Sequence, residues 1–186
     1  MHTIYHTRAV ILKSTPAREA DKLFWLFTRE LGLVVALATG IRKPESKLRA
    51  QLIDYTFVDV DLVRGKEAWR LVSGSEVANP LRESGELARP YVRLLGALER
   101  FLVDEGEHPQ LFAHVEEVAE LLHEPLDPKL FDTLALWRAL AHLGYISVDD
   151  ESVFTLPFRE ALTRVNEEMR KRLVVEVNRA ITQTHL

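Results

Sequence analysis

The stretch Phe57-Val58-Asp59-Val60-Asp61-Leu62-Val63 alternates apolar and acidic side chains, and it decides the fold of the first part of the chain. Successive side chains of a β-strand point to opposite faces, so Val58, Val60 and Leu62 share one face and the two aspartates share the other. The stretch therefore predicts a strand with one face in a core and one face in water.

Four more apolar runs rich in β-branched and aromatic residues surround this strand, at residues 9–12, 23–27, 33–38 and 69–72. The turn Arg64-Gly65-Lys66 joins the last of them to residues 57–63 as a β-hairpin. Five short strands within residues 1–80 predict a small barrel. A five-stranded barrel with basic loops fits the oligonucleotide-binding (OB) fold, which holds single strands along one face, although the pattern leaves other small barrels open.

After residue 80 the apolar period becomes helical. Apolar side chains recur at spacings of three and four in residues 91–102, 111–122 and 131–143, and a last helix is expected over residues 157–180. Prolines at positions 90, 109 and 128 mark helix starts. We therefore predict an α+β chain, with an OB-fold barrel in residues 1–80 and an all-α domain in residues 81–186.

Composition limits the classes of protein that fit. Of the 186 residues, 47% are hydrophobic, which is enough for real cores, but no run approaches the roughly 20 apolar residues that span a bilayer. The N-terminus lacks the basic and then apolar build of a signal peptide, so we expect a cytoplasmic protein with no membrane partner. The chain has no cysteine, which excludes disulfides and thiolate metal sites.

Charge is distributed unevenly along the chain. The net charge is -4, yet residues 1–80 contain twelve Lys or Arg against nine Asp or Glu, while residues 81–186 carry a net -7. Residues 39–49 alone hold four cations and one anion. Gly40 and Pro44 end the preceding apolar run, so this segment predicts a phosphate-binding loop; a solvated surface loop is the alternative.

The order of several short motifs resembles the RecO family of bacterial recombination mediators. The motifs are residues 8–13, 17–23, 26–33, 38–43, 46–49, 52–57, 64–65 and 140–145.

The resemblance implies a fold and a function. Family members pair an N-terminal OB barrel with a helical domain, bind single- and double-stranded DNA and anneal complementary strands. They work with RecR, and in some lineages RecF, to load RecA onto DNA coated by single-stranded-DNA-binding protein, which makes them DNA repair mediators and not enzymes. Many carry a four-cysteine zinc site after the motif at residues 140–145. Because residues 146–186 contain no cysteine, we expect a compact member with neither that zinc site nor another cofactor.

Annealing requires cations on phosphates and leaves the bases free to pair. The first candidates for DNA binding are Arg42, Lys43, Lys47 and Arg49, and the second are Arg8, Lys22, Arg29, Arg64 and Lys66. Three aromatic residues are candidates for stacking on bases, namely Trp25, Tyr55 and Phe57, although the apolar run around Trp25 favours packing in the core.

The helical part suggests a protein partner. As the family context implies, the tail of single-stranded-DNA-binding protein is acidic and ends in an aromatic residue, so its receptor is an apolar groove edged by cations. Arg93, Arg100 and Arg138 lie on apolar-rich helices and are candidates; ordinary helix-surface cations are the alternative.

Catalytic motifs are missing from the sequence. It has no His-Glu-x-x-His, no phosphate-binding Gly-rich loop ending in Lys-Ser/Thr and no Gly-x-Ser-x-Gly, and neither the His2 and His6 pair nor Asp149-Asp150-Glu151 has metal-binding spacing. We expect no enzyme activity and no metal. Two alternatives to DNA binding stay open: an interaction scaffold of repair complexes with weak or no DNA binding, and an OB-fold protein that binds RNA.

Overall fold

The computed structural model describes residues 3–66, 68–103, 106–148 and 152–183. The chain divides into two compact units. The first, here called the barrel unit, contains residues 1–82 and 102–112, and the second, the helical unit, contains residues 83–101 and 113–186. The sequence predicted one division after residue 80, and it gave no signal for the grouping of residues 102–112 with the barrel.

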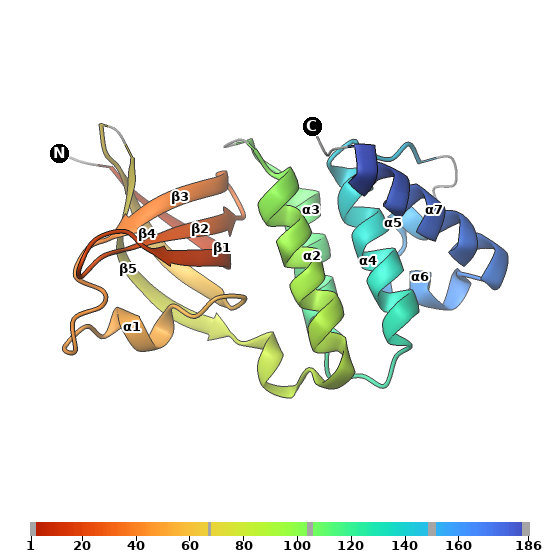
Figure 1. The fold of residues 1–186 in the computed structure, drawn as a ribbon, viewed down its shortest axis with the longest axis horizontal. Helices are drawn as coiled ribbons and strands as arrows, with labels where there is room; N and C mark the ends of the chain where they lie inside the picture. Colours follow the sequence, from red (N-terminus) through yellow and green to blue (C-terminus); the bar gives the residue numbers. More distant parts are fainter. Residues whose placement is uncertain (1–2, 67, 104–105, 149–151, 184–186) are drawn as a thin grey trace. The chain divides into compact units, whose positions relative to one another are not determined.

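The barrel unit is built on five strands: β1 (Ile4–Pro16), β2 (Lys22–Thr28), β3 (Gly32–Ala38), β4 (Phe57–Arg64) and β5 (Trp69–Ala78). They close into a barrel in the order β1-β2-β3-β5-β4 (Figure 1). Neighbouring strands are antiparallel except β3 and β5, which run parallel with Ala36 opposite Trp69. The predicted α+β class with an N-terminal five-stranded OB-type barrel is therefore confirmed.

The barrel interior confirms the alternation in residues 57–63. Val58, Val60 and Leu62 point into the core, while Asp59 and Asp61 lie on the outer surface. Burying a side chain of this size contributes about 1.5–3 kcal/mol, so these positions hold the barrel together. The other strands supply Ala9, Ile11, Phe24, Leu26, Val34, Ala36, Ala38, Trp69 and Leu71 to the same core.

A β-bulge in β1 controls which side chains reach the outer surface. Ile11 lies opposite Leu26 and Lys13 lies opposite Trp25, so Leu12 is an extra residue between two successive pairs. Ile11 belongs to the core, and the bulge brings Lys13 beside Trp25 on the outside of the barrel.

Phe112, near the start of α3 (Pro109–Glu120), covers one part of the barrel. Its ring lies 5.3 Å from that of Phe27 and 6.2 Å from that of Phe57. All three rings are buried. This aromatic contact explains why residues 102–112 group with the strands.

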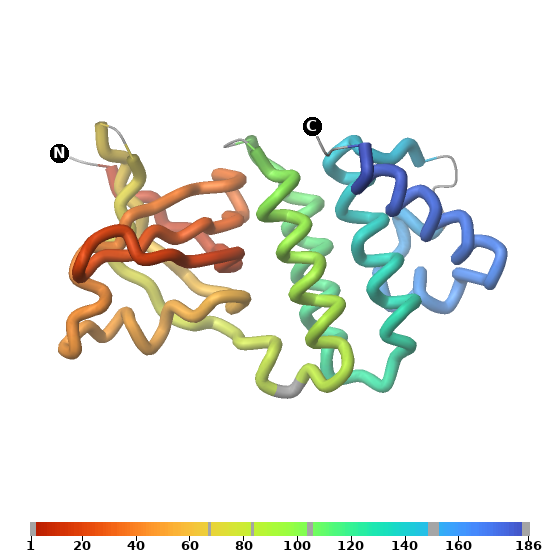
Figure 2. Tube along the Cα trace, viewed as in Figure 1, coloured from red at the N-terminus to blue at the C-terminus, as the bar shows by residue number. Residues whose placement is uncertain are grey.

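The helical unit contains α2 (Ala88–Phe101), most of α3, α4 (Pro128–His142), α5 (Ser152–Thr155), α6 (Phe158–Arg164) and α7 (Glu167–Gln183), preceded by the 3₁₀ turns η1 (Pro80–Glu83) and η2 (Gly85–Leu87), the first of which straddles the boundary between the units (Figure 2). The central helix α4 packs against α2 and α7. Asp127 caps α4 by accepting a hydrogen bond from the Lys129 backbone N–H at 2.9 Å. The three helices expected before residue 144 are confirmed.

The single helix expected over residues 157–180 is wrong, because it is broken into α6 and α7. Val165 has an extended backbone, with φ −72° and ψ 109°. The side chain of Asn166 then accepts a hydrogen bond from the Met169 N–H at 2.8 Å, which begins a new helix. The spacing of apolar residues continues from α6 into α7 across the capping residue Asn166, so the sequence pattern did not show the break.

Candidate nucleic-acid interface

The basic connection after β3 is held against the connection between β1 and β2. Gly40 adopts φ +68° and donates its N–H to the Asp21 carboxylate at 2.8 Å. Arg42 donates its backbone N–H to the Ala20 carbonyl at 3.0 Å and its Nη1 to the Arg18 carbonyl at 3.4 Å. We call residues 17–22 and 39–49 together the basic end of the barrel.

The four cations of residues 39–49 face water. Arg42, Lys43, Lys47 and Arg49 are exposed, and among the described residues none of them forms an ion pair. Lys22, Arg42 and Arg49 line a hollow of about 260 Å³ whose floor includes Ile41 and Leu52. The last residues of this segment form a one-turn helix, α1 (Leu48–Gln51), where an irregular loop was expected.

The sequence alone did not identify Arg18 as a member of this group. Its carbonyl accepts the Arg42 guanidinium and its own side chain is exposed. Nothing local in residues 17–22 marks it, because the segment has equal numbers of cations and acids. Only the hydrogen bonds to residues 40–42 bring it to the basic end.

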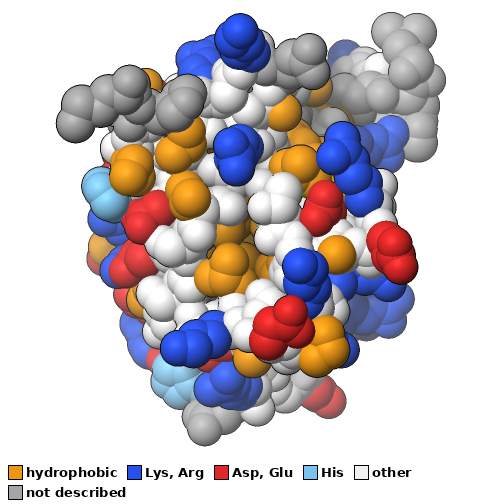
Figure 3. All heavy atoms as spheres, turned by 90° about the vertical axis from the view of Figure 1, so that its left-hand side faces the viewer, with side chains coloured by type: hydrophobic (Ala, Val, Ile, Leu, Met, Phe, Trp, Pro, Cys, Tyr) orange, Lys and Arg blue, Asp and Glu red, His pale blue; other side chains and the backbone are white. Residues whose placement is uncertain are grey.

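Figure 3 views the end of the barrel from which these connections project. Lys and Arg side chains are scattered across this face, with hydrophobic side chains exposed between them and some acidic side chains among them. Such a surface offers charges for phosphates together with apolar area for bases.

Arg8 and Arg29 lie in a different environment. Both line a groove of about 560 Å³ on the outside of β1, β4 and β5, together with Glu30, Asp59 and Asp61. Arg8 Nε donates to the Asp59 carboxylate at 3.1 Å, and the Arg29 guanidinium lies 5.4 Å from the Phe112 ring centre. A phosphate entering this groove meets three carboxylates, so these two cations are weaker DNA-binding candidates than the sequence indicated.

The same groove contains a chain of polar contacts. Ser73 donates its hydroxyl to the Asp61 carboxylate, and His6 Nδ1 lies 2.5 Å from the other oxygen of that carboxylate. The Ser73 hydrogen bond is the main reason that the pKa of Asp61 is lowered, with a smaller contribution from His6. Asp61 therefore stays ionised and keeps this face acidic.

Arg64 and Lys66 lie at the β4–β5 hairpin. The Arg64 guanidinium is 5.4 Å from the Trp69 ring centre. The side chains of Arg64 and Lys66 are exposed. The three groups of predicted cations thus occupy the basic end, the acidic groove and the hairpin.

The three aromatic residues predicted to stack on bases also lie in different environments. Phe57 is 5% exposed and packs on Phe112, so it is not a stacking surface for a base. Tyr55 is half-buried and has φ +70°, a backbone conformation that few residues with side chains adopt, with its N–H donated to the Ile11 carbonyl at 2.7 Å. The expected burial of Trp25 in the core is wrong: Phe24 and Leu26 point inward, and Trp25 lies half-buried on the outer surface.

Comparison with known proteins places this geometry in a family. The family described as Recombination protein O N terminal matches residues 1–80. A DNA repair protein RecO of Synechococcus elongatus is 37% identical over 154 residues, covering 78% of this chain and 56% of that protein. Two others share 29% identity: that of Syntrophomonas wolfei over 164 residues (81% and 65%), and that of Desulfitobacterium hafniense over 144 residues (76% and 52%).

Residues 1–80 of the chain belong to the RecO family. The chain spans between about half and two thirds of the length of these curated relatives. None of its 186 residues is a cysteine, so these residues form no four-cysteine zinc site.

The helical unit contains the three arginines that were predicted to bind the tail of single-stranded-DNA-binding protein. Arg93 is exposed and donates to Asp132 at 2.5 Å, and the Arg100 guanidinium lies 5.6 Å from the Phe101 ring centre. Both side chains lie on the surface of α2. Their role in tail binding stays a prediction.

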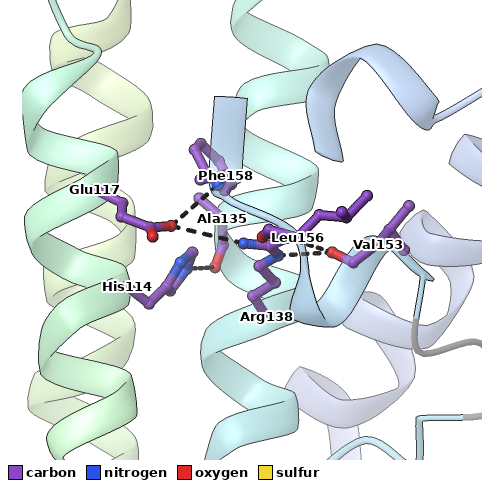
Figure 4. A network of polar contacts seen from close by, with 7 residues as sticks. All are labelled: His114, Glu117, Ala135, Arg138, Val153, Leu156 and Phe158. Atoms are coloured by element: carbon purple, nitrogen blue, oxygen red, sulfur yellow. Dashed lines mark hydrogen bonds and ion pairs between the residues drawn. The ribbon is translucent and has the colours of Figure 1, made fainter. Parts of the chain in front are cut away.

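Arg138 is buried, so its candidacy for tail binding is wrong. Its guanidinium donates to the carbonyls of Val153, at 2.8 Å from Nε, and Leu156, at 2.5 Å (Figure 4). Its Nη1 also lies 3.8 Å from Glu117, whose carboxylate accepts the Phe158 N–H at 3.0 Å. Burial lowers the pKa of Arg138 to about 10, which still leaves it charged at neutral pH.

His114 lies in the same network and is neutral. Its Nε2 is 3.0 Å from the Ala135 carbonyl, to which it donates (Figure 4). Burial is the main reason that its pKa falls to about 3, and the charge of Arg138 acts in the same direction. The network of Arg138, Glu117 and His114 therefore connects α3, α4 and the α5–α6 segment, and its role is structural.

The described residues also bear on the predictions about metals and membranes. Throughout the described ranges, no three His, Asp or Glu side chains are grouped closely enough to hold a metal ion. His2 and Asp149-Asp150-Glu151 lie outside the described residues. No helix in the described part of the chain is both long and apolar enough to cross a bilayer.

Proposed function

We propose that this chain acts in DNA repair and recombination by binding DNA phosphates at the basic end of the barrel. The observation that carries the proposal is the set of hydrogen bonds between residues 17–22 and 39–49. These bonds hold cations that form no ion pair among the described residues near one hollow. Phosphate contacts of this kind supply most of the sequence-independent affinity for nucleic acid. Such contacts suit both single and double strands.

The proposed role is that of a mediator without catalytic activity. Cations that reduce the repulsion between two phosphate backbones, while leaving bases free, favour annealing of complementary strands. Membership of the RecO family supports the further steps: cooperation with RecR, and with RecF where it is present, and loading of RecA onto DNA coated by single-stranded-DNA-binding protein, whose acidic tail is a proposed ligand. A DNA ligand supports the expected cytoplasmic location.

The test is a salt titration of DNA binding. A fluorescent single-stranded oligonucleotide is titrated with the wild type and with R42A/K43A/K47A/R49A, by anisotropy, at several salt concentrations. Each lost phosphate contact lowers the slope of log K against log salt by about 0.7 for a single strand. We expect the quadruple variant to lose both affinity and slope.

A charge-matched control separates local contact from net charge. R164A/K171A/R172A/R179A removes the same number of cations from the end of α6 and from α7, and these four residues are also exposed. We expect this variant to keep most of the affinity and slope. Equal losses in both variants overturn the assignment to the basic end, and no binding by the wild type at low salt favours an interaction scaffold.

A further inference from the structure

The outer surface of β1, β2 and β3 carries apolar side chains that the barrel core does not use. Phe24 and Leu26 of β2 point inward, so Leu23 and Trp25 point outward. By the same alternation Val35 and Leu37 of β3 lie on the outer surface, next to them. All four are only half-buried.

The strand register arranges these side chains in two rows. Lys13, Trp25 and Val35 are cross-strand partners, and so are Thr15, Leu23, Leu37 and Arg70 on β1, β2, β3 and β5. Adjacent strands are about 4.8 Å apart, and rows two residues apart along a strand are separated by about 6.8 Å. We call Lys13, Leu23, Trp25, Val35, Leu37 and Arg70 the outer strip.

The charges of the outer strip are all positive. Lys13 Nζ lies 5.2 Å from the Trp25 ring centre, and Arg70 is exposed at the far end of the second row. Neither row contains an acidic residue. The next residue of β2 before Leu23 is Lys22, which lines the hollow of the basic end. The strip therefore begins one residue away from that hollow, although the side chains of Lys22 and Leu23 point to opposite faces of the strand.

We infer that the outer strip is a base-stacking site for a single strand of nucleic acid leaving the basic end. The ring of Trp25 takes the face of a base, the leucines and valine supply apolar area beside it, and Lys13 and Arg70 hold the flanking phosphates. The faces of paired bases are stacked inside a duplex, so the strip adds affinity only for single strands. This inference rests on the proposed function and assigns its strand preference.

The test compares two substitutions at one position. Trp25→Leu keeps apolar cover on the sheet but removes the aromatic face, and Trp25→Phe restores a smaller aromatic face. Binding is measured to a labelled single strand and to a duplex of the same length, at one salt concentration. Thermal unfolding of each variant confirms that the barrel is intact.

We expect Trp25→Leu to weaken single-strand binding by roughly fivefold or more, with duplex binding unchanged and Trp25→Phe in between. Intrinsic fluorescence gives an independent readout, because Trp69 and Trp137 are 6% and 2% exposed while Trp25 is half-buried on the surface. Quenching by a single strand is expected in the wild type and absent in Trp25→Phe.

The failures of the two proposals are distinguishable. If Trp25→Leu leaves single-strand binding and quenching unchanged while R42A/K43A/K47A/R49A loses both ligands, the basic end stands and the stacking site is refuted. If Trp25→Leu weakens single strand and duplex equally, the strip does not select single strands, which also overturns the inference. If the wild type binds neither ligand, both proposals fall.

Discussion

The basic end of the barrel and the interior of the helical unit use arginine in opposite ways. Arg42 projects into water and forms no ion pair among the described residues, and the Asp21 carboxylate beside its segment accepts the Gly40 N–H. Arg138 is 3% exposed and has both carbonyl and carboxylate partners. The residue type is the same, and its partners decide whether the cation is available to a phosphate or serves to connect helices.

The largest expected effect is a loss of stability on removing the buried Arg138. Arg138→Met leaves the carbonyls of Val153 and Leu156 without their donor and Glu117 without its cation. We expect the free energy of unfolding to fall by about 3 kcal/mol or more, since breaking a buried pair leaves unsatisfied polar groups. Urea unfolding followed by the helical circular dichroism signal measures it.

Arg93→Met is the control for this experiment, because Arg93 pairs with Asp132 at the surface and is itself about half exposed. Its expected cost is at most about 1 kcal/mol. Equal costs for the two variants contradict a structural role for Arg138.

A second prediction uses the neutral His114 beside Arg138. Because burial lowers its folded pKa to about 3 from an ordinary 6.5, the folded state resists protonation. Its contribution to stability is complete above pH 6.5 and is lost as the pH falls toward 3, at up to about 1.4 kcal/mol per pH unit. Unfolding measured from pH 7 to 4 shows this slope, and His114→Gln, which does not titrate, flattens it. An unchanged slope in His114→Gln assigns the pH dependence to other groups.

A third prediction compares single cations on the barrel. Arg42→Ala removes a cation with no acidic partner and is expected to weaken oligonucleotide binding by about threefold to tenfold at low salt. Arg8→Ala removes a cation already paired with Asp59 and is expected to change binding by less than about twofold. Anisotropy titrations at one salt concentration measure both. A larger loss for Arg8→Ala moves the interface to the groove.

The smallest expected effect comes from making the acidic groove resemble the basic end in charge. Asp59→Asn/Asp61→Asn removes two acids from the groove, one of which is the carboxylate that accepts from Arg8 Nε. We expect DNA affinity to rise by about twofold, with a steeper salt dependence. A fall in affinity contradicts the view that these carboxylates repel phosphate.

The sequence predicted the barrel well because its strands carry local signals. The alternation in residues 57–63 and the turn at Gly65 specify a hairpin within one segment, and the proline positions specify three helices. Residues 23–27 gave the wrong side for Trp25, because every residue in that run is apolar and the pattern contains no alternation that selects a face. The bulge at Leu12, which brings Lys13 to Trp25, has no signature in the sequence either.

The candidate site was predicted in part for a related reason. Arg42, Lys43, Lys47 and Arg49 were identified by local charge density. Arg18 joins them through a hydrogen bond from Arg42, which lies 24 positions away, and Arg8 is set apart by Asp59 on another strand. Arg138 lies on a helix that is buried nearly all round, so no polar face in the sequence showed that this cation points inward.

The most direct test of the basic end is photo-crosslinking of a single-stranded oligonucleotide containing 5-iodouracil, with the attached peptides identified by mass spectrometry. The account predicts crosslinks in residues 17–25 and 39–49 that disappear at high salt. Crosslinks confined to the groove residues of β4 and β5, or to α7, contradict it.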